Sequence, residues 1–327
     1  MKFDPPKHTL SIFEITVYCS SKKNRVPLDK IPYKSNNDPK SPTVFLDLYD
    51  IFDDFFTKNK DSIRQQNKKN IGYRYKNSWS NVLQRSIITR MERGEFGTSR
   101  EVENMIKSQN TGTTTLDPSH IVFEPFYLGL FVPKNKTSAF FFSPKRGVIS
   151  LKSLFWADFE KYFRERTQCN IECKLFINSD VYNEWMDAEV SQIIATTVRV
   201  GEQISDDITE EVPFEEYPEY TETKIIRPAK PIFRNPLNNF ISYSDKYGVT
   251  LNSKYEGSAN QYDEVKAQVK KGNRTLLFPL KTMGRDLARE FQIELPDLIY
   301  GTDGHPKLES IQSEYTSVYN EYEKYLQ

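Results

Sequence analysis

The alternation of hydrophobic and polar positions is clearest over residues 121–177. Residues 121–132 are dense in β-branched and aromatic side chains, which predicts a strand. We expect this strand to begin after Pro125, because proline cannot donate a ladder hydrogen bond. Two more strand-like runs, 139–142 and 148–151, flank a segment with an early proline and a late glycine. That segment, residues 143–147, is predicted to be a hairpin loop.

A helix is expected next, followed by another strand. Apolar side chains recur at helical spacing at Leu154, Phe155, Phe159, Tyr162 and Phe163. Residues 171–177 then have the composition of a strand. The order strand, hairpin, helix and strand predicts a sheet with a helix packed on one face.

The N-terminal part predicts one strand and two further helices. Residues 9–19 largely alternate apolar and polar positions, which predicts a strand. Ser41 and Pro42 have the form of a helix start, with serine as the N-cap and proline at the first helical position. Thr98 and Glu101 match a capping box, which predicts a helix over residues 98–109.

The C-terminal part predicts a smaller subdomain, in which residues 275–280 form a strand and Pro306 opens a last helix. The expected fold class is α/β (α+β), with a mixed, largely antiparallel sheet, helices packed on it, and a smaller C-terminal α/β subdomain. We expect a main α+β domain over residues 1–200 and an acidic, then proline-rich, linker or arm over 201–236. Residues 237–327 would form the subdomain that ends in a helix.

The overall charge argues against a generally basic nucleic-acid binder, because Lys+Arg and Asp+Glu both number 45 in this chain of 327 residues. The three cysteines are an odd and small number, typical of a reducing compartment, so Cys19, Cys169 and Cys173 are expected to be ordinary thiols. The sequence shows no apolar leader and no run of membrane-spanning length. We therefore expect a soluble, cytoplasmic protein without a membrane partner.

Local charge is nevertheless uneven. Residues 58–76 hold seven basic residues against the single acid Asp61. Basic residues interleaved with aromatic ones suit phosphate contact and base stacking. The candidate nucleic-acid-binding residues are Lys68, Lys69, Arg74, Lys76, Tyr73 and Tyr75. The alternative is a charged loop followed by a short strand at residues 71–75.

Residues 202–222 have the opposite charge. They contain nine acidic residues and no basic one, with Phe214, Tyr217 and Tyr220 interleaved. Such a composition buries too little apolar surface to fold by itself. We expect a mobile arm that orders on a basic surface, either residues 58–76 of this chain or a partner's surface. The alternative is a simple linker.

One short motif carries candidate chemistry. Glu172 and Lys174 form an E-x-K on a predicted strand, where alternation places both side chains on one face. The motif resembles the core of the PD-(D/E)xK nuclease superfamily, in which acids hold Mg²⁺ and the lysine orients the attacking water. The resemblance implies Asp158, Glu172 and Lys174 as catalytic residues, although Asp158 lies in a predicted helix and not at a strand start. The alternative is a surface strand with paired charges.

A second resemblance concerns the segments FFFSPKRGVISLKSLFWADFEKYF and NIECKLFI. They are similar to uncharacterised bacterial proteins of prophages and defence islands, which implies a role in phage defence and supplies no catalytic residues. The favoured function is a non-catalytic binding component of an antiphage system, without a metal or cofactor, that contacts nucleic acid or a partner protein. The alternatives are a Mg²⁺-dependent nuclease and a structural subunit that assembles into an oligomer through aromatic surfaces, so enzymatic activity is left open.

Overall fold

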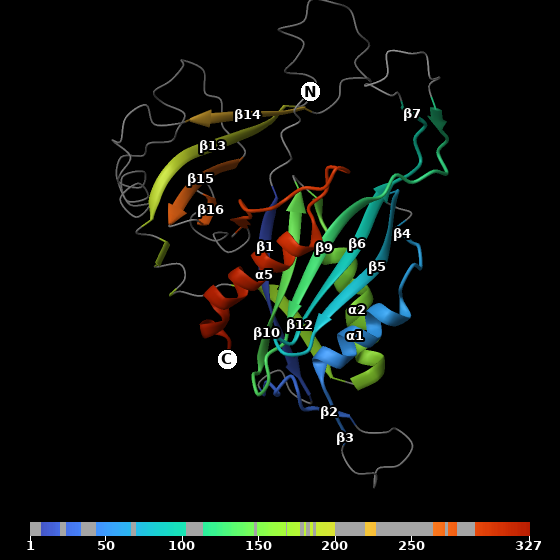
Figure 1. Cartoon of the computed structure of the whole chain (residues 1–327), viewed down its shortest axis with the longest axis vertical. Coiled ribbons are helices and arrows are strands. Elements are labelled where there is room, and N and C mark those ends of the chain that lie inside the picture. Colours follow the sequence, from blue (N-terminus) through green and yellow to red (C-terminus); the bar gives the residue numbers. More distant parts are fainter. Residues whose placement is uncertain are drawn as a thin grey trace, which may run out of the picture. The chain divides into compact units, whose positions relative to one another are not determined.

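The structure is a computed structural model of the whole chain (Figure 1). It describes residues 8–19, 24–33, 44–66, 70–102, 114–146, 149–167, 169–176, 180, 184–185, 188–199, 220–226, 264–271, 274–279 and 292–327. The chain divides into two compact units. Unit 1 contains Ile12–Lys174 and Asp297–Gln327, and unit 2 contains Lys7–Ser11 and Leu175–Pro296.

Unit 1 is built on a largely antiparallel sheet. Its strands follow the order β1-β10-β9-β6-β5-β4, with β11 paired to β10 and β12 paired to β1. Their bounds are β1 Thr9–Tyr18, β4 Arg64–Gln66, β5 Ile71–Asn81, β6 Ser86–Glu95, β9 Glu124–Phe131, β10 Ser138–Arg146, β11 Ile149–Ser150 and β12 Asn170–Leu175. Two short hairpins accompany this sheet, β2 (Ile31–Tyr33) with β3 (Val44–Leu46) and β7 (Arg100–Val102) with β8 (Thr114–Leu116).

The turn of the long hairpin formed by β5 and β6 is held by side-chain hydrogen bonds of Asn81 and Arg85. The Asn81 side-chain oxygen accepts hydrogen bonds from the backbone N–H groups of Leu83 and Gln84, both at 3.1 Å. This is the turn-forming behaviour for which asparagine is favoured. Arg85 completes the turn with a φ of 50°. Its side chain donates to the Val132 carbonyl and to the Asp47 carboxylate, so the tip is fixed to the body of unit 1.

Helices α1 (Leu48–Lys58) and α2 (Lys152–Thr167) cover one face of this sheet (Figure 1). Aromatic rings fill the space between the helices and the strands. Phe52 of α1 stacks on Phe159 of α2 with ring centroids 3.9 Å apart, and Phe55 meets Tyr75 of β5 edge-on at 5.4 Å. Each such pair contributes about 1 kcal/mol beyond the area it buries. The stripe of Phe155, Phe159 and Phe163, expected from helical spacing, lies in this core.

Helix α5 (Leu308–Tyr322) packs on the opposite face, over β9 and β10, and a 3₁₀ turn (Glu323–Tyr325) follows it. Tyr319 stacks on Phe131 at 4.5 Å, and the buried Tyr315 hydroxyl donates to the Tyr127 carbonyl at 2.6 Å. The close approach requires glycine at position 129, since a Cβ there would lie 2.6 Å from the Tyr315 ring. Unit 1 therefore has three layers, with the sheet between α1 and α2 on one side and α5 on the other.

Unit 2 is a second antiparallel arrangement. Its strands follow the order β14-β13-β15-β16-β17, and β17 pairs with the first residues of β1. The bounds are β13 Glu189–Arg199, β14 Tyr220–Ile226, β15 Glu264–Lys271, β16 Arg274–Pro279 and β17 Gln292–Glu294. The strand predicted over residues 275–280 corresponds to β16.

The expected α+β class with a mostly antiparallel sheet is confirmed. Several local expectations were wrong. Residues 143–146 of the loop predicted at 143–147 are instead the end of β10, which runs through Pro144 and pairs with β11. The strand expected to begin after Pro125 begins one residue before it, at Glu124. Tertiary pairing overrides the local preference of proline at both places.

Two predicted helices also differ from the structure. The first begins at Leu48, capped by the Asp47 carboxylate, whereas residues 44–46 form a strand. Ser41 and Pro42 lie outside the described residues. In the second, over 98–109, the described residues 100–102 are strand β7, whose pairing with β8 replaces the capping-box geometry.

The division into domains also differs from the expected one. The last helix, α5, belongs to unit 1 and not to a C-terminal subdomain, because its buried tyrosines pack on β9 and β10. Most of the acidic segment, residues 202–219, lies outside the described residues, as do Phe214 and Tyr217. Its end is not a mobile arm, since Tyr220 and Glu222 pair with Arg199 and Thr197 in the β14–β13 ladder.

The cysteines correct the expectation of three ordinary thiols. Cys19 and Cys169 form a disulfide across a sequence separation of 150 residues. Cys19 follows β1 and Cys169 precedes β12, so the pairing of these two strands brings the thiols together, which no local pattern reveals. Cys173 remains a free thiol, and burial raises its pKa to about 12.

Breaking the Cys19–Cys169 bond should destabilise unit 1. The bond joins residues separated by 150 positions, for which the chain-entropy model gives about 5 kcal/mol of stabilisation. We expect a reducing agent to lower the unfolding temperature of the wild type, and Cys19→Ser to show the low value with or without reductant. Cys173→Ser is the control and should keep the redox dependence. Equal unfolding temperatures for oxidised and reduced wild type would contradict the structure.

Candidate functional site

Asp158, one of the candidate catalytic acids, lies among hydroxyl and guanidinium donors. Its Oδ2 accepts hydrogen bonds from the hydroxyls of Tyr73, at 3.1 Å, and Tyr75, at 3.0 Å. The Arg64 guanidinium pairs with the same oxygen at 2.7 Å. Three donors therefore converge on one oxygen that α2 holds above β4 and β5. These contacts tie α2 to the strands β4 and β5 beneath it.

The two tyrosines are structural partners of Asp158. Burial, followed by the negative charge of Asp158, raises the pKa of Tyr73 to about 12. The same causes raise the pKa of Tyr75 well above its ordinary value. Both phenols therefore stay protonated and donate to the carboxylate near neutral pH.

Glu172 and Lys174 form a separate group. They share one face of β12, as strand alternation predicted, and their side chains pair at 2.7 Å. β12 pairs with β1, and the strands β10, β9 and β6 lie between β1 and the β5 strand that carries the partners of Asp158. The structure thus does not bring Asp158 together with Glu172 and Lys174. Among the described residues there is also no cluster of three or more His, Cys, Asp or Glu side chains suited to a metal.

The candidate nucleic-acid-binding residues are also dispersed. Tyr73 and Tyr75 are 5% and 0% exposed, so the expectation that they stack on bases is wrong for this fold. Arg74 pairs with the buried Glu92 at 2.7 Å and packs on the Phe123 ring. Lys76 pairs with Asp61 at 2.7 Å. Lys68 and Lys69 lie outside the described residues.

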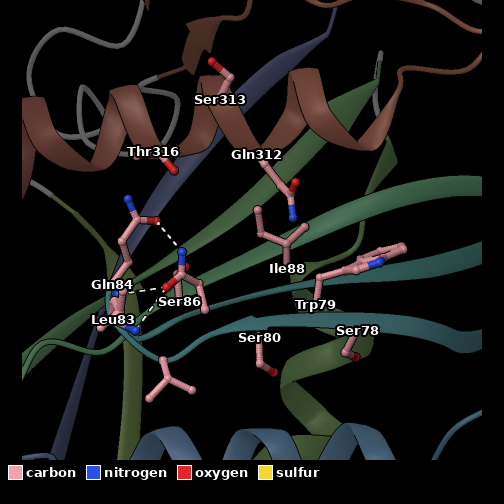
Figure 2. Close-up of a pocket in the computed structure, with 12 residues that line it drawn as sticks. Ser78, Trp79, Ser80, Leu83, Gln84, Ser86, Ile88, Gln312, Ser313 and Thr316 are labelled. Carbon is pink, nitrogen blue, oxygen red and sulfur yellow. Dashed lines mark hydrogen bonds between the residues drawn. The ribbon is translucent and has the colours of Figure 1, made fainter.

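A pocket of about 860 Å³ opens between α5 and the end of the β5–β6 hairpin. We call it the α5 pocket. Figure 2 shows Trp79 and Ile88 on the sheet and Gln312 and Thr316 on the helix bordering the same space. The full lining is Ser78, Trp79, Ser80, Asn81, Val82, Leu83, Gln84, Ser86, Ile88, Gln312, Ser313 and Thr316. The pocket lies where α5, which packs over β9 and β10, passes beside the hairpin end of β5 and β6.

The chemistry of this lining is uncharged. Eight of the twelve residues are Ser, Thr, Asn or Gln, and the other four are apolar. None carries a charge, although 28% of the chain is charged. Figure 2 shows the side chains of Ser78 and Ser80 pointing to the α1 side of the sheet, so their hydroxyls do not face the pocket. Hydroxyl and amide groups both donate and accept hydrogen bonds, and Trp79 offers a large apolar surface. The α5 pocket can therefore bind a neutral, hydrogen-bonding ligand or a peptide segment.

Apolar side chains extend the α5 pocket at the hairpin tip. Val82 is 73% and Leu83 is 98% exposed, the two largest exposed fractions among the large apolar residues of the described part. The turn that carries them is held by Asn81 and Arg85. A fixed turn that presents apolar side chains beside a polar pocket has the chemistry of a protein contact surface.

Sequence reasoning did not find the α5 pocket, because its two sides lie more than two hundred residues apart in the chain. The available signal was local: Trp79 lies between two serines, and Val82 and Leu83 follow Asn81 in an otherwise polar stretch. No protein-family model, curated protein or solved structure matches the chain. In the described residues, no helix has the length and apolar character needed to cross a membrane.

Asp158→Ala should reduce the free energy of unfolding by about 3 kcal/mol, because it leaves two buried hydroxyls and a guanidinium without their acceptor. Lys174→Ala is the control and should cost about 0.5 kcal/mol or less, since the Lys174 side chain is 73% exposed. Denaturant titration of both variants measures the difference. Similar small losses for the two would show that the Asp158 cluster is not a structural element.

Proposed function

We propose that the protein is a non-catalytic binding component that captures a partner protein in the α5 pocket. The observation that carries this proposal is the uncharged, hydrogen-bonding lining of the pocket around Trp79. Trp is enriched where proteins bind one another, and amide and hydroxyl side chains match the donors and acceptors of a peptide backbone. The exposed Val82 and Leu83 at its rim add apolar contact area.

The same lining favours a protein over a nucleic acid. Affinity for nucleic acids depends mainly on Lys and Arg contacts to phosphates. None of the twelve lining residues is basic. Of the basic candidates on β5, Arg74 is engaged by Glu92 and Lys76 by Asp61. Binding at the α5 pocket should therefore lack the steep salt dependence that phosphate contacts produce.

The lining also supports binding over catalysis. General acid–base and nucleophilic chemistry need a titratable group within hydrogen-bond reach of the substrate. The α5 pocket is lined by neutral amides, alcohols and apolar groups, and the acid Asp158 belongs to α2 on the opposite face of the sheet. Assembly through aromatic surfaces has less support, since Phe45 is the one aromatic among the exposed large apolar side chains of the described part.

Selection from a random displayed peptide library tests the proposal. We expect peptides that bind the wild type and lose affinity at least about tenfold with Trp79→Ala, since a buried aromatic anchor contributes roughly 2 kcal/mol or more. Thr316→Arg should have a similar effect, because it places a long charged side chain in the α5 pocket.

Ser317→Arg is the matched control for the charge, since Ser317 is exposed and lies outside the pocket lining. Parallel titrations with duplex DNA and single-stranded RNA distinguish the ligand class. The proposal fails if no selected peptide depends on Trp79. It also fails if nucleic acid binds with a steep salt dependence that Trp79→Ala removes.

The biological setting is proposed from the sequence resemblance to prophage and defence-island proteins. In this proposal the partner belongs to the same antiphage system, and the protein acts in the cytoplasm. The Cys19–Cys169 disulfide is more typical of oxidising compartments. Plaque counts on cells that carry the natural locus, combined with cell fractionation, test both parts. Trp79→Ala should restore plaque formation. Unchanged protection by this variant would contradict the role of the pocket in defence, and a non-cytoplasmic fraction would contradict the proposed location.

A further inference from the structure

The outer edge of β5 is paired only over part of its length. β4 pairs with Ile71, Gly72 and Tyr73, and the Asp61 N–H then donates to the Tyr75 carbonyl at 2.8 Å. Within the described residues, the backbone pairing of this edge ends there, and residues 77–81 have β6 as their only strand neighbour. An unpaired stretch of this kind offers backbone donors and acceptors to another chain.

The register identifies which backbone groups point outward. The bond from Asp61 shows that the peptide groups of Tyr75 face the outer edge. A one-residue bulge follows, so that Tyr75 opposes Met91 and Ser78 opposes Thr89. Met91 and Thr89 are two residues apart in β6, so their peptide groups point to the same side of that strand. The peptide groups of Ser78, which opposes Thr89, therefore point to the outer edge as those of Tyr75 do, and those of Ser80 point the same way. Within the part of the chain that the structure describes, the N–H and C=O groups of Ser78 and Ser80 therefore form an unpaired ladder at this edge.

This edge lacks the features that usually prevent strand addition. Natural edge strands are protected by lysine, proline or a covering element. Residues 77–81 read Asn-Ser-Trp-Ser-Asn and contain neither lysine nor proline. Asn77, Ser80 and Asn81 are exposed. The bulge lies at the start of the stretch and leaves Ser78–Asn81 in regular pairing with β6.

The two faces beside the edge have different chemistry. On the pocket face, Trp79 lies beside Tyr127, with ring centroids 6.2 Å apart, and borders the α5 pocket. On the opposite face, the Ser80 hydroxyl donates to the Asp53 carboxylate at 2.6 Å, and Figure 2 shows Ser78 and Ser80 pointing to that side. Asp50, an exposed residue one turn earlier on α1, adds a second carboxylate. A basic side chain is therefore favoured on the α1 face and an aromatic or β-branched one on the pocket face.

We propose that an extended segment of a partner protein adds to the sheet at Ser78–Ser80 of β5, with alternate side chains facing the α5 pocket and Asp50 and Asp53. This inference rests on the proposed binding function and specifies its mode and the chemistry of the partner. Backbone hydrogen bonds would supply affinity, and the alternation of apolar and basic residues would supply specificity. The partner segment should therefore carry Lys or Arg at every second position, with aromatic or β-branched residues between them.

Ser80→Pro tests the backbone contact. Proline removes the outward N–H, which an edge strand tolerates because the lost donor is not part of the ladder to β6. The probe is a selected library peptide that binds the wild type, carried on a fluorophore. We expect Ser80→Pro to weaken its binding about tenfold or more, since a ladder hydrogen bond and its neighbours are lost. Ser80→Ala is the matched control: it removes the same hydroxyl and keeps the N–H, so binding should stay close to wild type.

N-methylation of the peptide tests the same ladder without altering the fold. In an added strand, every second N–H of the peptide points to β5 and the others point away from it. Methylation of the N–H groups that point to β5 should abolish binding, and methylation of the others should leave it unchanged. Asp50→Asn together with Asp53→Asn should weaken the peptides that carry alternating Lys or Arg.

The outcomes separate this inference from the proposed function. If Trp79→Ala weakens binding but Ser80→Pro and both methylation patterns do not, the α5 pocket binds a partner and strand addition is wrong. If selected peptides lack the alternation of basic and apolar residues, the assigned partner chemistry is wrong. If no peptide depends on Trp79, both proposals fail. Concentration-dependent dimers that Ser80→Pro abolishes, in place of peptide binding, would assign the edge to a second copy of the chain.

Discussion

The packing of aromatic rings between α1, α2 and the sheet is the interaction on which the rest of unit 1 depends. Phe52 and Phe159 stack between the two helices, and Phe55 reaches Tyr75 on β5. A tyrosine in this position carries a hydroxyl that must find a partner away from water. Asp158 supplies it, from the same helix as Phe159, and Arg64 balances the charge. The acid that a nuclease would use is thus required by the core.

The unequal cover of the two faces of the sheet accounts for the α5 pocket. Two helices fill the first face, and a single helix lies on the second, brought close to β9 at Gly129. The rest of the second face is covered differently at its two ends. At one end of the β5–β6 hairpin, Phe123 packs on Arg74. At the other end, Trp79 and Ile88 line the α5 pocket, beside an edge that is incompletely paired within the described residues.

Elements with a clear period could be predicted from the sequence, and features that depend on long-range pairing could not. The stripe of α2 is set by residues three and four apart, and the structure confirms it. Strand β7 and the continuation of β10 through Pro144 depend on partner strands, which override local signals. The disulfide between Cys19 and Cys169 and the pocket between Trp79 and Thr316 need a correct sheet order before they can be seen. The same holds for the buried Tyr73 and Tyr75. The sequence around an aromatic residue next to a basic one is the same whether its ring faces solvent or the core.

Charge gives the least direct guide to recognition in this chain. The basic window suggested a surface for anions, yet four of its described cations are paired with acids of the same chain: Lys58 with Asp54, Arg64 with Asp158, Arg74 with Glu92 and Lys76 with Asp61. Such pairs fix elements in place but leave little net field for a distant partner, and solvent screens what remains. The surface left for recognition is the neutral lining of the α5 pocket and the backbone of β5. Specificity there must come from shape and hydrogen-bond register, and Asp53, which the Ser80 hydroxyl contacts, adds a charge beside the edge.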